Sequence, residues 1–503
     1  MTIETELKLR IAPELLARLK RHPLLRTHQV TRPITRRLYN IYYDTPKLEL
    51  HGSGMALRLR RSGRQWLQTL KGGGSVKAGL HQRNEWEVPV HGAALDFSST
   101  QNTDWDEHLP KPLRKKLQPV FVTDFSRSSR MLLWQDAQIE LCMDQGVVRT
   151  EQRGIPLCEL ELELKSGSPQ QLFELALAIL DIVPFELEVI SKAEQGYRLL
   201  SGVAEHPVKA TVASITREDT LAEALQSLIW SCLLHLQSNS RGAMAGEDAE
   251  YLHQMRVALR RLRVVLRMAE KLHADPQLAV LSKQVAALCS ALGRIREWDV
   301  FIAQTVQPMC ARMAGHGGLQ ALLAISERQR DACRAALRGE APARELQRMI
   351  LNFAIWMNGP YWQQQVLPQV HDFATSRLQK LAKRFARSGQ HLNTLDAPRL
   401  HALRILAKKL RYSAEFFSGL YDRQKARSFL AALSEVQEVL GQINDIAVTH
   451  RLLDGLAANP ELSAHQEAVV LAKGWIAHDL TRQFTALRKA VQRFSRQSTF
   501  WEK

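Results

Sequence analysis

The sequence contains few cysteines, and none of the six forms a Cys-x-x-Cys pair. Without such pairs, neither a disulfide framework nor a structural zinc site is indicated. We therefore expect free and largely buried thiols, as in a cytoplasmic protein. The six are Cys142, Cys158, Cys232, Cys289, Cys310 and Cys333.

The sequence also lacks an uninterrupted run of about 18 apolar residues, the length that a membrane-spanning helix needs. Its first residues alternate acidic and apolar side chains, unlike the basic and apolar stretches of a secretory signal. These two absences predict a protein without a membrane span, located in the cytoplasm.

Acidic residues fall well short of basic ones in the second part of the chain only. Residues 1–200 hold 28 Lys and Arg against 24 Asp and Glu, whereas residues 201–503 hold 40 against 27. The net charge is therefore +4 in the first segment and +13 in the second. A strongly basic segment favours a polyanionic partner, which could be nucleic acid, an acidic membrane or polyphosphate.

Proline is concentrated before residue 210, where 12 of the 19 prolines lie. Short segments between these prolines alternate apolar and polar residues, which predicts strands separated by turns. Helical spacing occurs there only at 12–20 and 169–181. Many strands with few helices are typical of an antiparallel barrel or sandwich. The predicted strands span residues 3–10, 38–46, 54–62, 64–71, 81–90, 129–135, 137–146 and 157–166.

From about residue 217 the apolar residues recur at helical spacing, which predicts an all-helical region. We divide the chain into a β-rich domain at 1–203, a linker at 204–217 and a helical domain at 218–495. The predicted helices span residues 219–236, 250–272, 276–294, 317–338, 341–357, 369–386, 397–418, 425–441 and 462–491.

Ionised residues recur on one face of several predicted strands. Glu4, Glu6 and Lys8 alternate with Thr or apolar residues, so they share a face. Adjacent like charges repel. Such faces either point into solvent or line a channel in which cations and a metal neutralise the acids. The other charged faces comprise Arg58 and Arg60; Arg83, Glu85 and Glu87; Glu140 and Asp144; and Glu159, Glu161 and Glu163.

The first 200 residues resemble the CYTH, or triphosphate tunnel metalloenzyme, superfamily. The resemblance implies an eight-stranded antiparallel β-tunnel that hydrolyses triphosphate or cyclises ATP with a divalent metal. The segments that carry it, in order, are ETELK (4–8), YYDTP (42–46), ALRLR (56–60), LQTLK (67–71), DFSR (124–127), IELCMDQG (139–146), CELELEL (158–164) and SKAEQGYR (191–198).

The same resemblance implies roles for individual residues. The carboxylates that would hold Mg²⁺ or Mn²⁺ are Glu4, Glu6, Asp144, Glu159, Glu161 and Glu163. Which of Glu159, Glu161 and Glu163 contact the metal directly is left open. The cations that would grip the phosphates are Lys8, Arg58, Arg60, Lys71, Arg127 and Lys192. The residues that would support these two sets are Arg83, Glu85 and Glu140.

The helical region contains an internal repeat. HQMRVALRRLR (253–263) matches HALRILAKKLR (401–411), and LGRIREWD (292–299) matches LGQINDIA (440–447). Both pairs are separated by 148 residues. Two motifs at one offset indicate duplication of a helical unit, with copies around 218–355 and 366–495.

Each copy carries a basic stripe within an arc of about 80° on one helix. A basic helix face is often simply solvated, but its duplication favours a binding surface for a linear polyanion. Aromatic residues, which stack on bases, are sparse nearby, so polyphosphate is favoured over single-stranded nucleic acid. The stripes comprise His253, Arg256, Arg260, Arg263 and Arg267 in the first copy and His401, Arg404, Lys408 and Arg411 in the second.

Residues 218–495 resemble the CHAD family, a duplicated helical bundle often fused behind a CYTH domain. That resemblance implies binding of inorganic polyphosphate without catalysis. In one departure, Gln442 and Asn444 stand where the first copy has Arg294 and Arg296, so the two copies are expected to contribute unequally.

These inferences together predict an α+β tunnel followed by an all-α duplicated bundle. The tunnel is predicted to convert tripolyphosphate to diphosphate and phosphate, while the bundle tethers polyphosphate. One alternative is an adenylate cyclase or an organic (thiamine or nucleoside) triphosphatase. Another is a non-catalytic polyphosphate-binding protein, against which the acids at positions 4, 6 and 159–163 argue. The oligomeric state is left open.

Overall fold

The computed structural model describes residues 2–98, 104–246, 248–272, 274–362, 367–389 and 396–502. The chain forms two compact units. The first comprises Met1–His206 with Ala343–Pro360, and the second comprises Pro207–Pro342 with Tyr361–Lys503. The first unit thus includes most of helix α13 (Glu340–Met357), which lies in sequence among the helices of the second.

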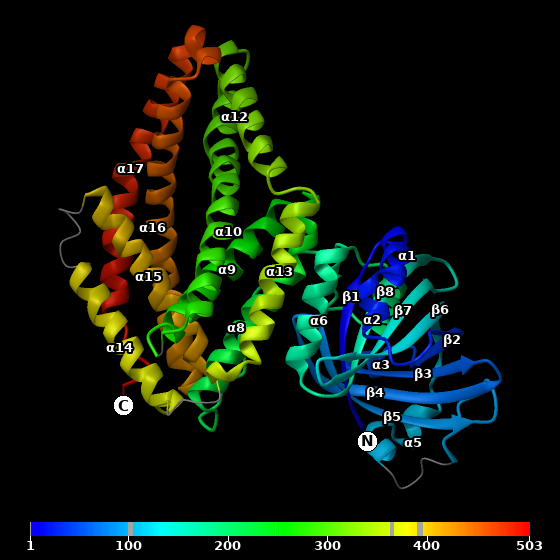
Figure 1. Ribbon diagram of the computed structural model, residues 1–503. Helices are drawn as coiled ribbons and strands as arrows, with labels where there is room; N and C mark the ends of the chain where they lie inside the picture. Colours follow the sequence, from blue (N-terminus) through cyan, green and yellow to red (C-terminus); the bar gives the residue numbers. More distant parts are fainter. Residues whose placement is uncertain are drawn as a thin grey trace. The chain divides into compact units, whose positions relative to one another are not determined.

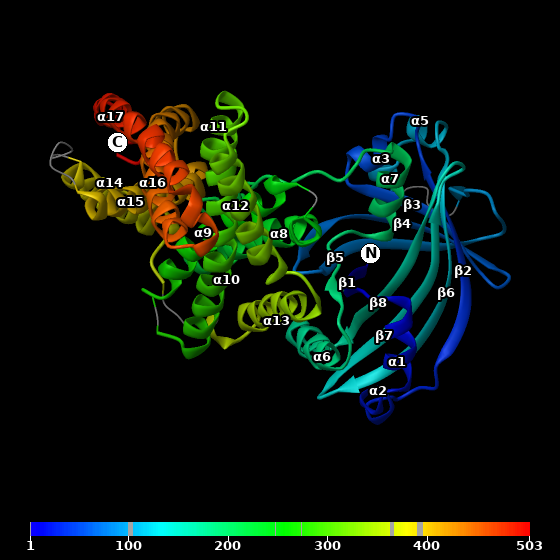
Figure 2. The ribbon, with the colours of Figure 1, turned by 90° about the horizontal axis from the view of Figure 1, so that it is seen from above.

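The first unit is a closed antiparallel β-barrel (Figures 1 and 2), as predicted. Eight strands follow one another in the order β5-β4-β3-β2-β6-β7-β8-β1, and β1 pairs with β5 to close the sheet. A short strand, β9 (Glu186–Leu187), also pairs with β1. The eight are β1 (Thr2–Arg10), β2 (Ile34–Asp44), β3 (Met55–Ser62), β4 (Gln65–Lys77), β5 (Leu80–Val90), β6 (Gln118–Trp134), β7 (Ala137–Arg149) and β8 (Gly154–Ser166).

Burial of one side of each strand fixes which residues face the barrel interior. On β3, Leu57 and Leu59 are fully buried outside the barrel, in a cluster with Trp105. Burying each leucine contributes about 1.5–3 kcal/mol. Because successive side chains point to opposite faces, Arg58 and Arg60 must then face inward. The helices of this unit, besides α13, are α1 (Pro13–Arg21), α2 (Pro23–Thr27), α3 (Glu49–Gly52), α4 (Asp104–His108), α5 (Lys111–Arg114), α6 (Pro169–Ile182) and α7 (Lys192–Ser201).

Helix α7 packs closely against β6. Ser191 caps it by accepting a hydrogen bond from the Glu194 amide. Tyr197 meets Phe121 edge to face at 5.0 Å. At Gly196 an added Cβ would lie 2.1 Å from the Phe121 ring, so only glycine allows this approach. The close packing holds Lys192, the first residue of α7, at the barrel interior.

Helix α13 is tied to the barrel by polar contacts. Its Gln347 accepts a hydrogen bond from the Leu187 amide of β9 at 3.1 Å. Arg348 forms an ion pair with Asp181 of α6 at 2.8 Å.

The second unit is helical throughout its regular structure, and its helix positions agree with the duplication. Helix α9 begins at Ala249 and α15 at Ala397, which are 148 residues apart. Its helices are α8 (Leu221–Ala245), α9 (Ala249–Ala269), α10 (Pro276–Phe301), α11 (Gln307–Arg312), α12 (Gly317–Ala335), α14 (Val370–Ser388), α15 (Ala397–Phe417), α16 (Arg423–Ala457) and α17 (Gln466–Ser495).

One continuous helical stretch, Pro276–Arg312, has the length and apolar composition that a membrane crossing requires. The core helices of many globular proteins have the same properties. A single stretch of this kind is therefore weak evidence for a membrane span.

Candidate functional site

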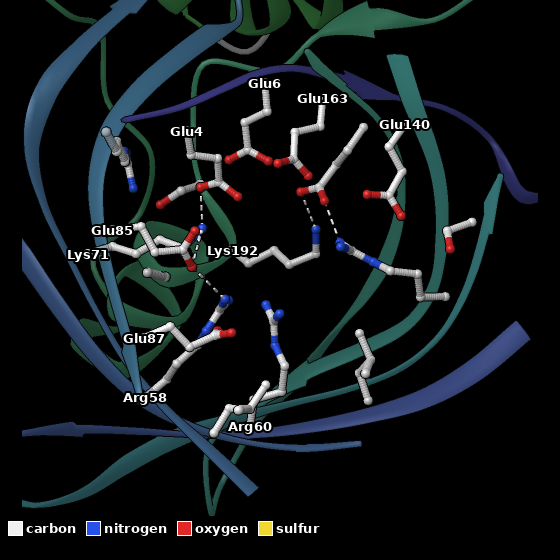
Figure 3. A pocket seen from close by; sticks show the side chains of 18 of the residues that line it. Glu4, Glu6, Arg58, Arg60, Lys71, Glu85, Glu87, Glu140, Glu163 and Lys192 are labelled. Atoms are coloured by element: carbon white, nitrogen blue, oxygen red, sulfur yellow. Dashed lines mark hydrogen bonds and ion pairs between the residues drawn. The ribbon is translucent and has the colours of Figure 1, made fainter. Parts of the chain in front are cut away.

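The barrel encloses a cavity of about 360 Å³ whose wall is largely ionic. Figure 3 shows Glu4, Glu6 and Glu163 on one side and Arg58 and Arg60 on the opposite side. The enclosed, charged channel, which was one of the two alternatives left open by strand alternation and the one that the resemblance implied, is therefore present. Its cationic lining residues are Lys8, Arg36, Arg58, Arg60, Lys71, Arg83, Arg127, Lys165 and Lys192, and its acidic ones are Glu4, Glu6, Glu85, Glu87, Glu140, Glu161 and Glu163.

Strand register gathers the carboxylates on one wall. Glu6 of β1 lies directly opposite Glu163 of β8, and Glu163 lies opposite Glu140 of β7. Burial raises the pKa of Glu163, against the opposing effect of Lys165. A wall of adjacent carboxylates supplies only hard oxygen donors, which suit Mg²⁺ or Mn²⁺ and exclude a thiolate-type site.

In the described part of the chain, no three Asp, Glu, His or Cys side chains form a ready-made metal cluster. The carboxylates instead contact neighbouring lysines. Glu4 pairs with Lys71, and Glu6 lies 2.8 Å from Lys8. Lys165 contacts Glu163 at 2.5 Å and Glu140 at 3.3 Å. The carboxylates of this wall suit a hard cation chemically, and to bind one they must first separate from these lysines.

Asp144 and Glu159, both predicted metal ligands, lie outside the cavity lining. Asp144 is fully buried and accepts two hydrogen bonds from Arg127, at 2.8 and 2.6 Å. Glu159 accepts one from Lys192 and one from Gln195, both at 2.8 Å. In these positions the two carboxylates orient Arg127 and Lys192 toward the interior.

Glu161 lines the cavity but is surrounded by cations. It accepts hydrogen bonds from Lys192 at 2.7 Å, from Lys8 and from Arg127. Burial alone would raise the pKa of Glu161, but these three cations outweigh it and hold the pKa well below its usual value. Glu161 is therefore an ionised centre that organises positive side chains.

Several arginines of the cavity lack an acidic partner. Within the described ranges, no carboxylate lies at ion-pair distance from Arg36, Arg60 or Arg83. Among the described residues, Arg60 donates only to Asn40, at 3.1 Å. Burial, helped by Arg58 and Arg127, lowers the pKa of Arg60 to about 10. Arg60 is half-buried, and a partly desolvated cation without a partner is costly, so this position is prepared for an anion.

Sequence reasoning missed two charged residues of the lining, Lys165 and Arg36, and placed Glu87 on a charged strand face without giving it a role. Lys165 continues the alternation of β8, so the pattern itself could have indicated it. Arg36 lies at the start of β2, ahead of the predicted strand at 38–46. Apart from Asp144 and Glu159, all the predicted tunnel residues line the cavity, including Arg83, Glu85 and Glu140.

The helical unit contains a second cavity, of about 410 Å³, formed by both repeats. Six of the nine predicted basic residues converge on it. Arg263, Arg267 and Arg411 do not; Arg411, for example, pairs with Glu415 at 2.7 Å. The lining residues that carry charge or could bind an anion are His253, Arg256, Arg260, Arg296, His401, Arg404, Lys408 and Arg451, with Glu297 and Asp445.

The guanidinium groups of this helical cavity are incompletely paired. Nε and Nη1 of Arg256 and Nε of Arg404 are buried without a hydrogen-bond partner in the described structure. Burial, followed by the nearby Arg260, lowers the pKa of Arg256 to about 10. At the position corresponding to Arg296, Asn444 contacts His401 at 3.2 Å. The expected inequality between the repeats is not found in the charge of the lining, because Arg451 of the second copy offsets the loss of an arginine at Asn444. Each repeat contributes three Lys or Arg side chains, one His and one carboxylate.

Comparisons with known proteins agree with both folds. The CYTH domain model matches residues 2–197, and the CHAD domain model matches residues 227–454. An inorganic triphosphatase from Haemophilus influenzae is 34% identical over 208 residues, which cover 40% of this chain and 55% of that protein. The chain thus spans about half the length of that curated relative. The CHAD domain structure from the plant Ricinus communis is 31% identical, with a TM-score of 0.50, covering 57% of this chain and 97% of that one.

Proposed function

We propose that this chain, a CYTH domain followed by a CHAD domain, is a metal-dependent triphosphatase that splits inorganic tripolyphosphate into diphosphate and phosphate. The observation that carries the proposal is the barrel cavity, in which a wall of carboxylates faces Arg60, an arginine without an acidic partner among the described residues. The likeness to an inorganic triphosphatase supports it.

The arginines are the binding groups for the phosphate chain. Arg36, Arg60 and Arg83 have no carboxylate partner in the described structure, so they can contact phosphate oxygens without first breaking an ion pair. Guanidinium groups present several N–H donors in a plane that matches phosphate oxygens. Lys8 and Lys71 can turn from Glu6 and Glu4 toward the substrate once those carboxylates hold a metal.

Glu4, Glu6 and Glu163 are the residues that would hold Mg²⁺ or Mn²⁺, which would offset phosphate charge and activate water. Arg127 and Lys192 are fixed by Asp144 and therefore do not need to reorganise during reaction. Such fixed positive charge stabilises the negative charge that develops on the departing diphosphate.

The lining supports an inorganic substrate over a nucleotide. The ring of Phe125 lies 5.7 Å from the Arg127 guanidinium and 5.3 Å from Lys192 Nζ, while Tyr42 is stacked on Phe121 at 4.5 Å. Tyr42 and Phe125 are also each only 3% exposed, so they offer a purine little open ring surface. The adenylate cyclase and organic triphosphatase alternatives would need such a surface.

We further propose that the helical cavity binds inorganic polyphosphate as one site shared by both repeats. Support comes from the unpaired nitrogens of Arg256 and Arg404, which belong to different repeats and line the same space. An anion there satisfies donors from α9 and α15 together.

The test is release of phosphate by full-length protein from tripolyphosphate, ATP, thiamine triphosphate and long-chain polyphosphate, each with Mg²⁺, with Mn²⁺ and with EDTA. The proposal expects metal-dependent turnover that is fastest with tripolyphosphate. Faster turnover of ATP or thiamine triphosphate would favour the organic alternatives.

A further inference from the structure

The helical cavity contains a lysine for which the described part of the chain shows no counterion. Lys408 of α15 is half-buried and, within the described chain, has no hydrogen-bond or ion-pair partner. Its charged neighbours in the lining are mostly cations, with two carboxylates among them. These neighbours are His253, Arg256, Arg260, Arg296, Glu297, His401, Arg404, Asp445 and Arg451.

This environment makes the Lys408 amine a nucleophile at neutral pH. Burial, followed by repulsion from Arg404, Arg260 and Arg256, lowers the pKa of Lys408 to about 7. About half of the molecules therefore carry a neutral Nζ near pH 7, against well under 1% for an ordinary lysine. A neutral amine is the form that attacks a carbonyl carbon.

The same cavity supplies donors for a phosphate group beside that amine. Arg256 and Arg404 each have buried guanidinium nitrogens without a partner in the described structure, and both line the space that Lys408 faces. A small molecule with a phosphate at one end and an activated acyl group at the other would be held by the arginines next to Nζ. Acyl phosphates have this chemistry.

We propose that the helical cavity is a self-acylation site, in which a bound acyl phosphate transfers its acyl group to Lys408. The neutral Nζ attacks the carbonyl carbon and forms an amide. The bond between that carbon and the phosphate oxygen breaks, phosphate leaves with the electron pair, and the proton lost from Nζ passes to it. No other reactant is needed.

Acylation removes a positive charge from the cavity, so it is expected to weaken retention of a polyanion there. This consequence depends on the polyphosphate binding proposed above, whereas the acylation itself does not. Acylation without any change in polyphosphate retention would refute the proposed binding function and leave the modification site standing.

The experiment incubates full-length protein with acetyl phosphate in EDTA at pH 7.5 and measures acetylation at each lysine by mass spectrometry with fragment ions. Lys409 is the matched control, because burial also lowers its pKa but it lies outside the cavity lining. We expect acetylation about tenfold faster at Lys408 than at Lys409, because only Lys408 lines the cavity whose arginines would hold the acyl phosphate beside the amine. Equal labelling would overturn the proposal.

Two further measurements separate phosphate-directed transfer from simple amine reactivity. Inorganic pyrophosphate should suppress labelling of Lys408 and leave Lys409 unchanged, because it competes for the arginines. Acetic anhydride, which has no phosphate, should label the two lysines with a smaller preference. If pyrophosphate does not protect Lys408, the cavity does not direct the reaction. Because the pyrophosphate test uses the unaltered protein, it does not depend on a variant that folds.

Discussion

Lys192 Nζ lies 2.7 Å from Glu161 Oε1, which ties the first residue of α7 to the middle of β8 inside the barrel. Glu161 also accepts from Lys8 and Arg127, so one buried anion organises three cations. Arg36, Arg60 and Arg83, for which the described structure shows no carboxylate partner, remain available for a substrate. This arrangement explains how a barrel can keep a concentrated positive charge in its interior before any phosphate binds.

Replacing Glu6 with Gln is expected to reduce metal-dependent phosphate release at least about 100-fold, because the carboxylate wall loses a donor for the cation. Binding of polyphosphate by the full-length Glu6→Gln protein should not change. The measurement is phosphate release from tripolyphosphate with Mg²⁺, beside a polyphosphate-retention assay. Glu14→Gln, on the exposed side of α1, is the control and should retain full turnover. Unimpaired turnover in Glu6→Gln would show that Glu6 is not a metal ligand.

Arg60→Gln and Arg127→Gln should separate substrate binding from stability. Arg60 has no carboxylate partner, so its loss should raise KM about tenfold or more without lowering the free energy of unfolding. Arg127→Gln leaves Asp144 without its guanidinium and should cost about 3–5 kcal/mol. Urea unfolding of both variants, together with their kinetics, tests the distinction. A larger loss of stability in Arg60→Gln than in Arg127→Gln would contradict it.

The stability of the barrel should fall below pH 4.5 in part because of Glu6. Burial raises the pKa of Glu6, but Lys8 and Lys71 together outweigh it and lower the pKa from 4.5 to about 2. A lowered folded-state pKa contributes stability that is present above 4.5 and lost as the pH falls toward 2. Free energies of unfolding at pH 5 and pH 3 should therefore differ less in Glu6→Gln than in the unaltered protein. An identical difference would show that Glu6 is not held ionised.

Charge reversal can test whether the helical cavity, rather than a basic stripe, retains polyphosphate. Arg256→Glu with Arg404→Glu should weaken retention at least about tenfold, because both guanidinium groups line the cavity. Hydrolysis of tripolyphosphate should be unaffected. Arg267→Glu is the matched control, since it belongs to the same predicted stripe but is exposed outside the lining. If Arg267→Glu weakens polyphosphate retention equally, the basic stripe rather than the cavity is the binding surface.

Strand alternation predicted the charged strand faces but left open whether they point into solvent or into a channel, and the family resemblance favoured the channel. In the structure, burial of Leu57 and Leu59 outside the barrel forces Arg58 inward. Alternation shows which face of a strand a side chain occupies, but not whether that side chain reaches the surface of the cavity. Asp144 and Glu159 share a face with cavity residues, yet they lie behind its surface and bind Arg127 and Lys192. That outcome depends on which cations the neighbouring elements bring, and no single strand contains this information.

The helical stripes show a similar limit. An arc of about 80° identifies a basic face, but neighbouring helices decide which part of it borders the cavity. Arg411 forms an ion pair with Glu415, four residues later, at 2.7 Å and does not line the cavity. Arg451 does line the cavity, and it lies in the part of α16 beyond the helix predicted at 425–441. Convergence of the two repeats on one cavity is a tertiary property that repeat spacing alone does not determine.

The central claim is that the barrel's carboxylates and arginines together process a metal-bound triphosphate. The most direct measurement is the rate of phosphate release from tripolyphosphate by the purified full-length protein, with Mg²⁺ or Mn²⁺ and then with EDTA. The account predicts turnover with metal that EDTA abolishes and added metal restores. Undiminished turnover in EDTA, or none with either metal, would contradict it.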